Sequence, residues 1–164
     1  MTFFIRTASE RDLPAVQTLL GICWHATYDE IYGAERVSAI TAGWHSLPSL
    51  KASLSKPYSE FIVAEGPAGI AAMAYASQSD PAFVMLHQLY ILPEAQGHGL
   101  GGQILGEIES AFLDANAIRL EVEAANEKAV RFYERHGFET VSRTENCGKD
   151  EPGIAALVMQ KTAR

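Results

Sequence analysis

The sequence predicts an α/β fold whose mixed sheet joins an antiparallel N-terminal meander to a central parallel βαβ pair, with helices on both faces. Three apolar runs, Glu60–Glu65, Ile70–Gln78 and Phe83–Leu92, are separated by short turns. Such turns indicate antiparallel strands, because a parallel pair needs a crossover of a dozen or more residues. The third run is followed by a glycine-rich turn, a helical pattern and another alternating run, which is the order of a right-handed βαβ unit.

Length and composition predict one domain spanning residues 1–164, since the chain has no internal repeat and no Pro/Gly/Ser-rich linker. The net charge of −7 argues against nucleic acid as a partner. No apolar run approaches the roughly 18 residues of a membrane span, and the early charge at Arg6 does not fit a signal peptide. Cys23 and Cys147 match no disulfide or metal spacing, so we expect a cytoplasmic protein without a metal.

The N-terminal third is predicted to be one strand followed by helices. Phe3–Thr7 has a strand pattern, and the polar stretch Ser9–Asp12 starts a helix that tolerates Pro14 in its first turn. Further helices are predicted at Ala34–Ala42 and Leu47–Leu54. The first helix is expected to bury one face, which carries Leu13, Val16, Leu19, Leu20, Cys23, Trp24, Tyr28 and Ile31.

The second half of the chain completes the predicted sheet. A helix is expected over residues 100–114, and Ala117–Glu123 alternates as a strand does. The strand at Phe83–Leu92, this helix and Ala117–Glu123 form the βαβ unit. Another helix is predicted from Asn126 to Arg135, followed by closing strands at Phe138–Arg143 and Ile154–Gln160.

The stretch Leu89–Gly102 has the order of an anion site: a strand, a glycine turn and a helix start. Four glycines occur within six positions, at Gly97, Gly99, Gly101 and Gly102. Glycines allow positive φ angles and close approach of a ligand, and free N–H groups at a helix start attract phosphate. No Lys or Arg lies between Pro93 and Gln103, so backbone N–H groups must hold the anion.

The literal pattern G-x-G-x-x-G at residues 97–102, with Glu121 and Glu123 about 20 residues on, also matches a dinucleotide fingerprint. The context argues against that interpretation. Pro93–Gln96 separate the strand from the first glycine, and too little chain remains for the further βαβ units of a dinucleotide fold. A P-loop is excluded because no Gly-Lys-Ser/Thr follows.

The chain resembles the GNAT family of acyl-CoA-dependent N-acetyltransferases. The family signature Gln/Arg-x-x-Gly-x-Gly/Ala is similar to Gln96–Gly101, which follows the aliphatic-Pro end of a strand at Ile91–Pro93. A second match begins at Leu120–Val122, includes Asn126 and ends in the Phe-Tyr-x-x-x-Gly-Phe run at residues 132–138. The two motifs stand in the family's order.

The resemblance implies that acetyl-CoA is the cosubstrate and that its pantetheine arm lies along a strand edge between two splayed parallel strands. Asn126 would bond to this arm, and Tyr133 would direct its hydroxyl at the sulfur. The implied coenzyme-binding residues are Leu89, Tyr90, Ile91, Gln96, Gly97, His98, Gly99, Leu100, Gly101, Gly102, Asn126 and Tyr133.

Acetyl transfer to an amine needs an acid for the leaving thiolate and a base for the acceptor. A tyrosine with a pKa near 10 is protonated at pH 7, so Tyr133 is the candidate general acid; its alternative role is as a core residue. Many relatives carry a Glu where this chain has Met85. Glu121 matches a base of some peptide-acetylating relatives, or else is a structural carboxylate. His87 and a water-mediated route remain further options.

The acceptor is expected to be a primary amine of a small molecule or peptide. An aromatic-rich stretch with Trp24, His25, Tyr28, Tyr32 and Trp44 lies where relatives build the acceptor pocket, and Tyr28 or Trp44 would line it unless both are core residues. The resemblance also implies that the chain can form a homodimer. The alternative function, favoured by Met85, is a catalytically silent acyl-CoA-binding regulatory module.

Overall fold

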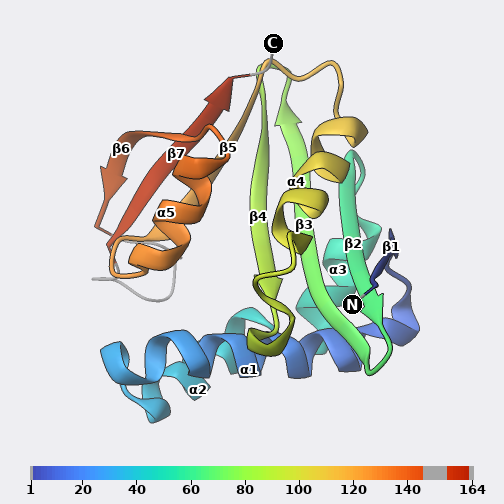
Figure 1. Ribbon diagram of the computed structural model, residues 1–164, viewed down its shortest axis with the longest axis vertical. Coiled ribbons are helices and arrows are strands. Elements are labelled where there is room, and N and C mark those ends of the chain that lie inside the picture. Colours follow the sequence, from blue (N-terminus) through green and yellow to red (C-terminus); the bar gives the residue numbers. More distant parts are fainter. Residues whose placement is uncertain (1, 146–154, 163–164) are drawn as a thin grey trace.

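The computed structural model describes residues 2–145 and 155–162, which form a mixed sheet between two groups of helices (Figure 1). Cys147 and Ile154 lie outside the described residues. The strands are β1 (Phe4–Thr7), β2 (Ser59–Gly66), β3 (Gly69–Asp80), β4 (Phe83–Ile91), β5 (Ala117–Glu123), β6 (Glu139–Thr144) and β7 (Ala156–Thr162). The helices are α1 (Leu13–Tyr32), α2 (Ala34–Trp44), α3 (Leu47–Ser55), α4 (Leu100–Ala111) and α5 (Glu127–Arg135), with short 3-10 turns at Glu10–Asp12 and Pro93–Ala95.

The sheet has the order β1-β2-β3-β4-β5-β7-β6. Strands β1 to β4 form the predicted antiparallel meander, and β4 pairs in parallel with β5 through the α4 crossover. The final strand β7 inserts between β5 and β6, which leaves β6 at the edge. The predicted fold class is therefore confirmed.

Alternating side chains of the meander divide the interior into two cores. Ile62 and Ala64 of β2 face α4 and α5, whereas Phe61 and Val63 face α1 and α3. This period of two follows from the pleat of a strand. In Figure 1, α4 and α5 lie in front of the sheet, α3 lies behind it, and α1 crosses its lower end.

The start of α1 is fixed by an ion pair with β1. The guanidinium of Arg6 donates two hydrogen bonds of 2.9 Å to the two carboxylate oxygens of Asp12. The backbone N–H of Ser9 donates to the same carboxylate at 2.8 Å. Bidentate pairs of this kind are strong and directional, and Arg6 holds the pKa of Asp12 well below its usual value. The polar stretch before the helix thus connects it to the sheet.

Most element boundaries differ from the sequence prediction by one to three residues, and three of the differences lie close to the turns around β4 and α4. The helix expected to end at residue 114 ends at Ala111. Strand β4 stops at Ile91 because Pro93, which has no N–H for a sheet ladder, starts a 3-10 turn. Strand β3 extends to Asp80, whose Oδ1 accepts a hydrogen bond from the Ala82 N–H at 2.7 Å and so forms the turn.

Helix α4 approaches α5 and β4 so closely that one of its glycines has no room for a side chain. A Cβ atom on Gly101 would lie 2.7 Å from the Phe132 ring and 3.4 Å from Cδ1 of Ile91. By contrast, a Cβ atom on Gly106, one and a half turns further along α4, would meet nothing within 4 Å. The close helix contact therefore requires glycine at Gly101 but not at Gly106.

We expect Gly101→Ala to lower the free energy of unfolding by about 1–3 kcal/mol, as overpacked cores do. Gly106→Ala is the matched control, since alanine at an open helical site should raise the unfolding free energy by about 0.5–1 kcal/mol. Urea unfolding followed by circular dichroism measures both. Equal effects at the two glycines would contradict the packing interpretation.

Candidate functional site

The candidate site begins where β4 separates from β5. The parallel pairing starts at Phe83 with Ala117 and ends at Leu86 with Leu120. Strand β4 then continues to Ile91 without a partner on that side among the residues that the structure describes, and Figure 1 shows the two strands diverging toward the lower end of the sheet. Backbone groups on this open edge of β4 need hydrogen-bond partners. An extended ligand between the strands can supply them.

A β-bulge lies at the point of separation. Leu86 of β4 pairs with Ala76 of β3, but the next pair is Gln88 with Tyr75, so His87 is an extra residue. A bulge bends its strand and increases the local twist. It also reverses the alternation, so that Leu86 before it and the odd-numbered residues Leu89 and Ile91 after it all face the core beneath α4.

The glycine turn follows β4 after the 3-10 turn at Pro93–Ala95 and has the expected backbone geometry. Gly97 has a φ angle of 83°, and Gly99, the N-cap residue of α4, has a φ angle of 75°. A Cβ atom on either would meet nothing within 4 Å, so conformation and not crowding requires glycine there. The first turn of α4 leaves backbone N–H groups without a partner inside the helix, and these groups point toward the glycine turn, as an anion site needs.

The side chains of the turn divide between surface and core. His98 is exposed and has its ring centroid 6.5 Å from that of Phe3, whereas Leu100 is buried and can offer a ligand only its backbone. Gln96 donates from Nε2 to the Ile91 carbonyl at 3.0 Å and accepts from Nζ of Lys128 at 2.7 Å. Lys128, from α5, brings a positive charge that the turn itself lacks.

Tyr133 of α5 is buried in the core against which Leu89 and Ile91 of β4 also pack. Its ring makes edge contacts with Phe132 and Phe138, with centroid separations of 5.2 and 5.5 Å. Burial, together with the charge of Glu123, raises the pKa of the Tyr133 phenol well above its ordinary value. Tyr90 of β4 shows the same effect for the same two reasons. Both hydroxyls are therefore protonated at neutral pH.

Asn126 performs two tasks at the start of α5. Its Oδ1 accepts a hydrogen bond from the Ala129 N–H at 3.2 Å, which caps the helix. Its Nδ2 donates to the Tyr28 hydroxyl of α1, also at 3.2 Å. The side chain that the resemblance assigns to the pantetheine arm thus already connects α5 to α1.

The structure brings Glu123, not Glu121, into the buried cluster. Glu121 is exposed on β5, whereas Glu123 at the end of the same strand is only 7% exposed. The Tyr28 hydroxyl donates to Oε2 of Glu123 at 2.6 Å. Burial raises the pKa of Glu123, the hydrogen bonds from Tyr28 and from the Glu123 backbone lower it, and the nearby charge of Glu121 raises it. Sequence reasoning did not assign a role to Glu123, although alternation along the strand places both glutamates on one face, opposite Leu120 and Val122.

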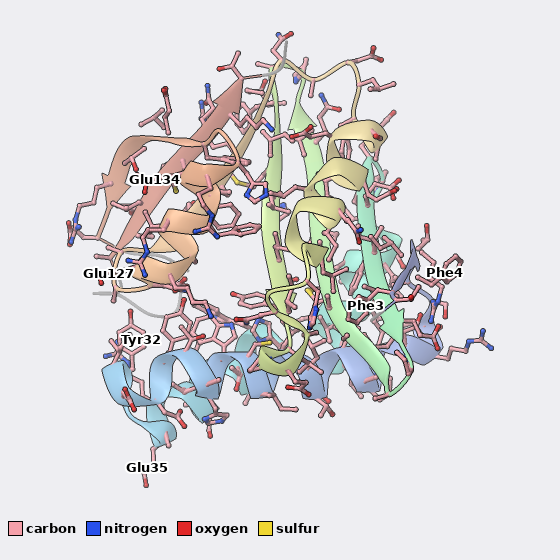
Figure 2. The ribbon with its side chains drawn as sticks, in the orientation of Figure 1. Phe3, Phe4, Tyr32, Glu35, Glu127 and Glu134 are labelled. Atoms are coloured by element: carbon pink, nitrogen blue, oxygen red, sulfur yellow. The ribbon has the colours of Figure 1, made fainter. Side chains whose placement is uncertain are left out.

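The aromatic residues of α1 and α2 form a cluster next to Glu123. Tyr28 stacks on Tyr32 with a ring-centroid separation of 5.6 Å, and its centroid lies 4.5 Å from that of Trp24. Trp44 packs edge-on against Trp24 with a centroid separation of 5.4 Å. Trp24 and Tyr28 are each 1% exposed. Figure 2 shows Tyr32 and Glu127 on the same side of the molecule, where α1 meets the start of α5.

The remaining candidates have structural partners. His87 shares a 2.7 Å hydrogen bond with the Ser77 hydroxyl and stacks on Tyr75, and burial lowers its pKa. His25 pairs with Asp29 at 2.6 Å on the helix surface. Met85 lies within the paired part of β4 and β5.

Across residues 2–145 and 155–162, no group of His, Cys, Asp and Glu side chains could hold a metal ion. No helix in the same residues has the length and apolarity of a membrane span.

Comparison with known proteins places this architecture among acetyltransferases. The family model for the acetyltransferase (GNAT) domain matches residues 28–163. The PaiA N-acetyltransferase of Thermoplasma acidophilum, solved in complex with coenzyme A, is similar over 99% of this chain and 100% of its own, with 22% identity and a TM-score of 0.86.

Two enzymes with different acceptors in their names have the same fold. The ribosomal-protein-S18-alanine N-acetyltransferase of Escherichia coli is 18% identical over 98% of this chain and 94% of its own, with a TM-score of 0.73. A chimera of spermidine N-acetyltransferase SpeG from Vibrio cholerae and hSSAT is 18% identical over 99% of this chain and 96% of its own, with a TM-score of 0.69.

Proposed function

The chain belongs to the GNAT acetyltransferase family, and we propose that it transfers an acetyl group from acetyl-CoA to a primary amine by direct attack in a ternary complex. The acceptor is the amine of a small molecule or peptide. The observation that carries the proposal is the open edge of β4, which has no strand partner beyond Leu86 within residues 2–145 and 155–162 and leads through a 3-10 turn into the glycine turn.

The donor site follows from this edge. The pantetheine arm would replace the missing strand along Leu89, Tyr90 and Ile91, and the pyrophosphate would bind the N–H groups of residues 97–102. The positive φ angles of Gly97 and Gly99 and the start of α4 support this placement. Lys128, which donates a hydrogen bond to Gln96, adds a cation next to the turn.

Tyr133 would serve as the general acid. A coenzyme thiolate has a pKa of about 8.5, and the phenol must remain protonated until the carbon–sulfur bond breaks. The raised pKa of Tyr133 meets this requirement. Proton transfer from an ordinary tyrosine to this thiolate would be uphill by about 2 kcal/mol, and the raised pKa of Tyr133 adds to that cost. An N–H group on the open edge of β4 can stabilise the oxyanion by about 3 kcal/mol.

The proposed reaction also needs a group that removes a proton from the acceptor's ammonium. The family resemblance implies Glu121 as this base. Glu123 lies two residues further along β5, on the same face of the strand. Met85, at the position where many relatives carry a carboxylate, cannot do this. The methionine at this position is the feature that favours the alternative function, a silent acyl-CoA-binding module.

We expect the purified protein to release free coenzyme A thiol from acetyl-CoA in the presence of at least one amine. The panel should include spermidine and a peptide with an N-terminal alanine, because similar structures carry these acceptors in their names. Thiol release is measured with a chromogenic disulfide, and the acetylated product by mass spectrometry. Acetyl-CoA binding without thiol release on a broad panel would support the silent module instead.

We expect Tyr133→Phe to lower kcat by roughly tenfold or more, because the variant keeps the ring packing but cannot donate a proton. Its affinity for acetyl-CoA, measured by calorimetry, should stay close to that of the wild type. Tyr58→Phe is the matched control, since Tyr58 is 81% exposed. A wild-type kcat in Tyr133→Phe would remove Tyr133 as the acid.

We expect Gly99→Val to abolish coenzyme binding, because a β-branched residue is strained at a φ angle of 75° and its side chain would project into the anion space. Calorimetric titration with coenzyme A measures the loss. Gly106→Ala on the exposed side of α4 controls for helix stability and should bind normally. Wild-type affinity in Gly99→Val would contradict the phosphate site.

A further inference from the structure

A buried carboxylate with a single side-chain donor lies at the end of β5. Oε2 of Glu123 accepts the 2.6 Å hydrogen bond from Tyr28, and Oε1 receives no hydrogen bond from another side chain in residues 2–145 and 155–162. A buried ionised carboxylate loses several kcal/mol of hydration unless partners replace the water. Besides the Tyr28 hydroxyl, the carboxylate accepts a hydrogen bond from the Glu123 backbone, and an ionised carboxylate has about four acceptor sites, so it can still bind a cation.

The position of the Tyr28 hydroxyl is fixed from three directions. Trp24 and Tyr32 pack against the Tyr28 ring, with centroid separations of 4.5 and 5.6 Å. Nδ2 of Asn126 donates a hydrogen bond to the Tyr28 hydroxyl oxygen at 3.2 Å. Because Tyr28 is 1% exposed, the hydroxyl has little freedom to turn away. Tyr28 therefore fixes the orientation of the Glu123 carboxylate instead of competing as a second titrating group.

Glu123 shares its surroundings with the proposed acid. The charge of Glu123 contributes to the raised pKa values of Tyr133 and Tyr90, which places all three in one poorly solvated cluster. The titratable groups that face Glu123 come from α1, β4, α5 and β5 itself, namely Tyr28, Tyr90, Tyr133 and Glu121. Apart from Glu121, which is exposed, none of them is an anion at neutral pH.

We propose that Glu123 is the general base of the acetyl transfer and that Tyr28 is the residue that positions it. This inference rests on the proposed acetyltransferase function. The acceptor's ammonium binds Glu123 in the space between β4 and β5 and gives it one proton. Glu121, which is exposed, does not perform this step.

The proton balance of the proposed reaction is complete with two side chains. After Glu123 takes one proton, the nitrogen lone pair attacks the thioester carbon and forms the C–N bond. The C–S bond then breaks, and its electron pair leaves with sulfur. Tyr133 donates its proton to the sulfur, and the second proton of the nitrogen returns to the Tyr133 oxygen. Glu123 releases its proton to solvent, so one turnover yields an amide, a thiol and one proton.

The direction of the Glu123 pKa supports this role. A carboxylate of ordinary pKa is a poor base for an ammonium whose pKa is about 10. Burial raises the Glu123 pKa, which narrows the difference and makes the proton transfer less uphill. The carboxylate remains the active form, so activity should fall as the pH decreases through the pKa of Glu123.

Glu123→Gln tests the proposal through the pH dependence of kcat/KM with the best amine of the panel. We expect kcat/KM of the variant to be lower than that of the wild type by roughly 100-fold or more at pH 7. The pH profile should lack the acid limb that Glu123 causes, and kcat/KM should recover as rising pH deprotonates the free amine. Glu134→Gln is the matched control; Glu134 is exposed on α5, and Figure 2 shows it on the outer surface. Melting temperature and acetyl-CoA affinity report whether each variant folds.

Tyr28→Phe separates positioning from structure. The Tyr28 hydrogen bond lowers the Glu123 pKa, so removing it should raise that pKa and move the acid limb to higher pH. A purely structural role would lower activity at all pH values without moving the limb, and that result would contradict the positioning role. Glu123→Asp retains a carboxylate that is one methylene shorter, so it should lower kcat and keep an acid limb. If Glu123→Gln does not fold, an unchanged kcat in Glu123→Asp would overturn the proposal.

The outcomes distinguish this inference from the proposed function. A wild-type protein that transfers acetyl groups, together with a Glu123→Gln variant within threefold of it and with the same pH profile, overturns the role of Glu123 alone. Loss of the acid limb in Glu121→Gln, with the limb retained in Glu123→Gln, assigns the base to Glu121. A wild-type protein inactive across the panel overturns the acetyltransferase function itself.

Discussion

The separation of β4 from β5 after Leu86 is the constraint on which the candidate site depends. A parallel pair that stayed closed would satisfy its own backbone groups and leave no edge for a ligand. The extra residue at His87 bends β4 where the pairing ends and reverses its alternation. As a result, Leu89 and Ile91 support the α4 core, while Tyr90 faces the aromatic cluster of α1 and α2. One inserted residue thus opens the sheet and orients the strand that borders the opening.

Much of the fold could be predicted from the sequence because its signals are local. The meander, the βαβ unit and the glycine turn each follow from periodicity and turn residues, and the structure confirms them. The bulge at His87 could not be predicted, since Leu-His-Gln-Leu-Tyr-Ile fits a regular strand equally well. The order of β7 and β6 depends on long-range pairing, about which local patterns say little.

The four glycines show the same limit within the candidate site. Sequence reasoning assigned all of them to one anion site, but the structure divides them by cause. Gly97 and Gly99 are required by positive φ angles, whereas Gly101 is required by the close approach of the Phe132 ring from α5, and a Cβ atom on Gly102 would lie 3.1 Å from Nε2 of His136. Glu123 was not identified for a similar reason. Its importance depends on Tyr28, which is 95 residues away in the sequence, and no pattern along β5 distinguishes it from the exposed Glu121.

The arrangement of Glu123 and Tyr133 allows each proton transfer in the proposed reaction to promote the other. While Glu123 is ionised, its negative charge raises the pKa of Tyr133 and keeps the phenol protonated. When Glu123 takes the acceptor's proton, that charge disappears and Tyr133 becomes a stronger acid, at the stage when negative charge develops on the sulfur. The reverse also holds, because two nearby anions disfavour each other. The poorly solvated cluster strengthens the coupling, since water screens charges less effectively there. An exposed base at Glu121 would be screened by solvent and would influence Tyr133 far less.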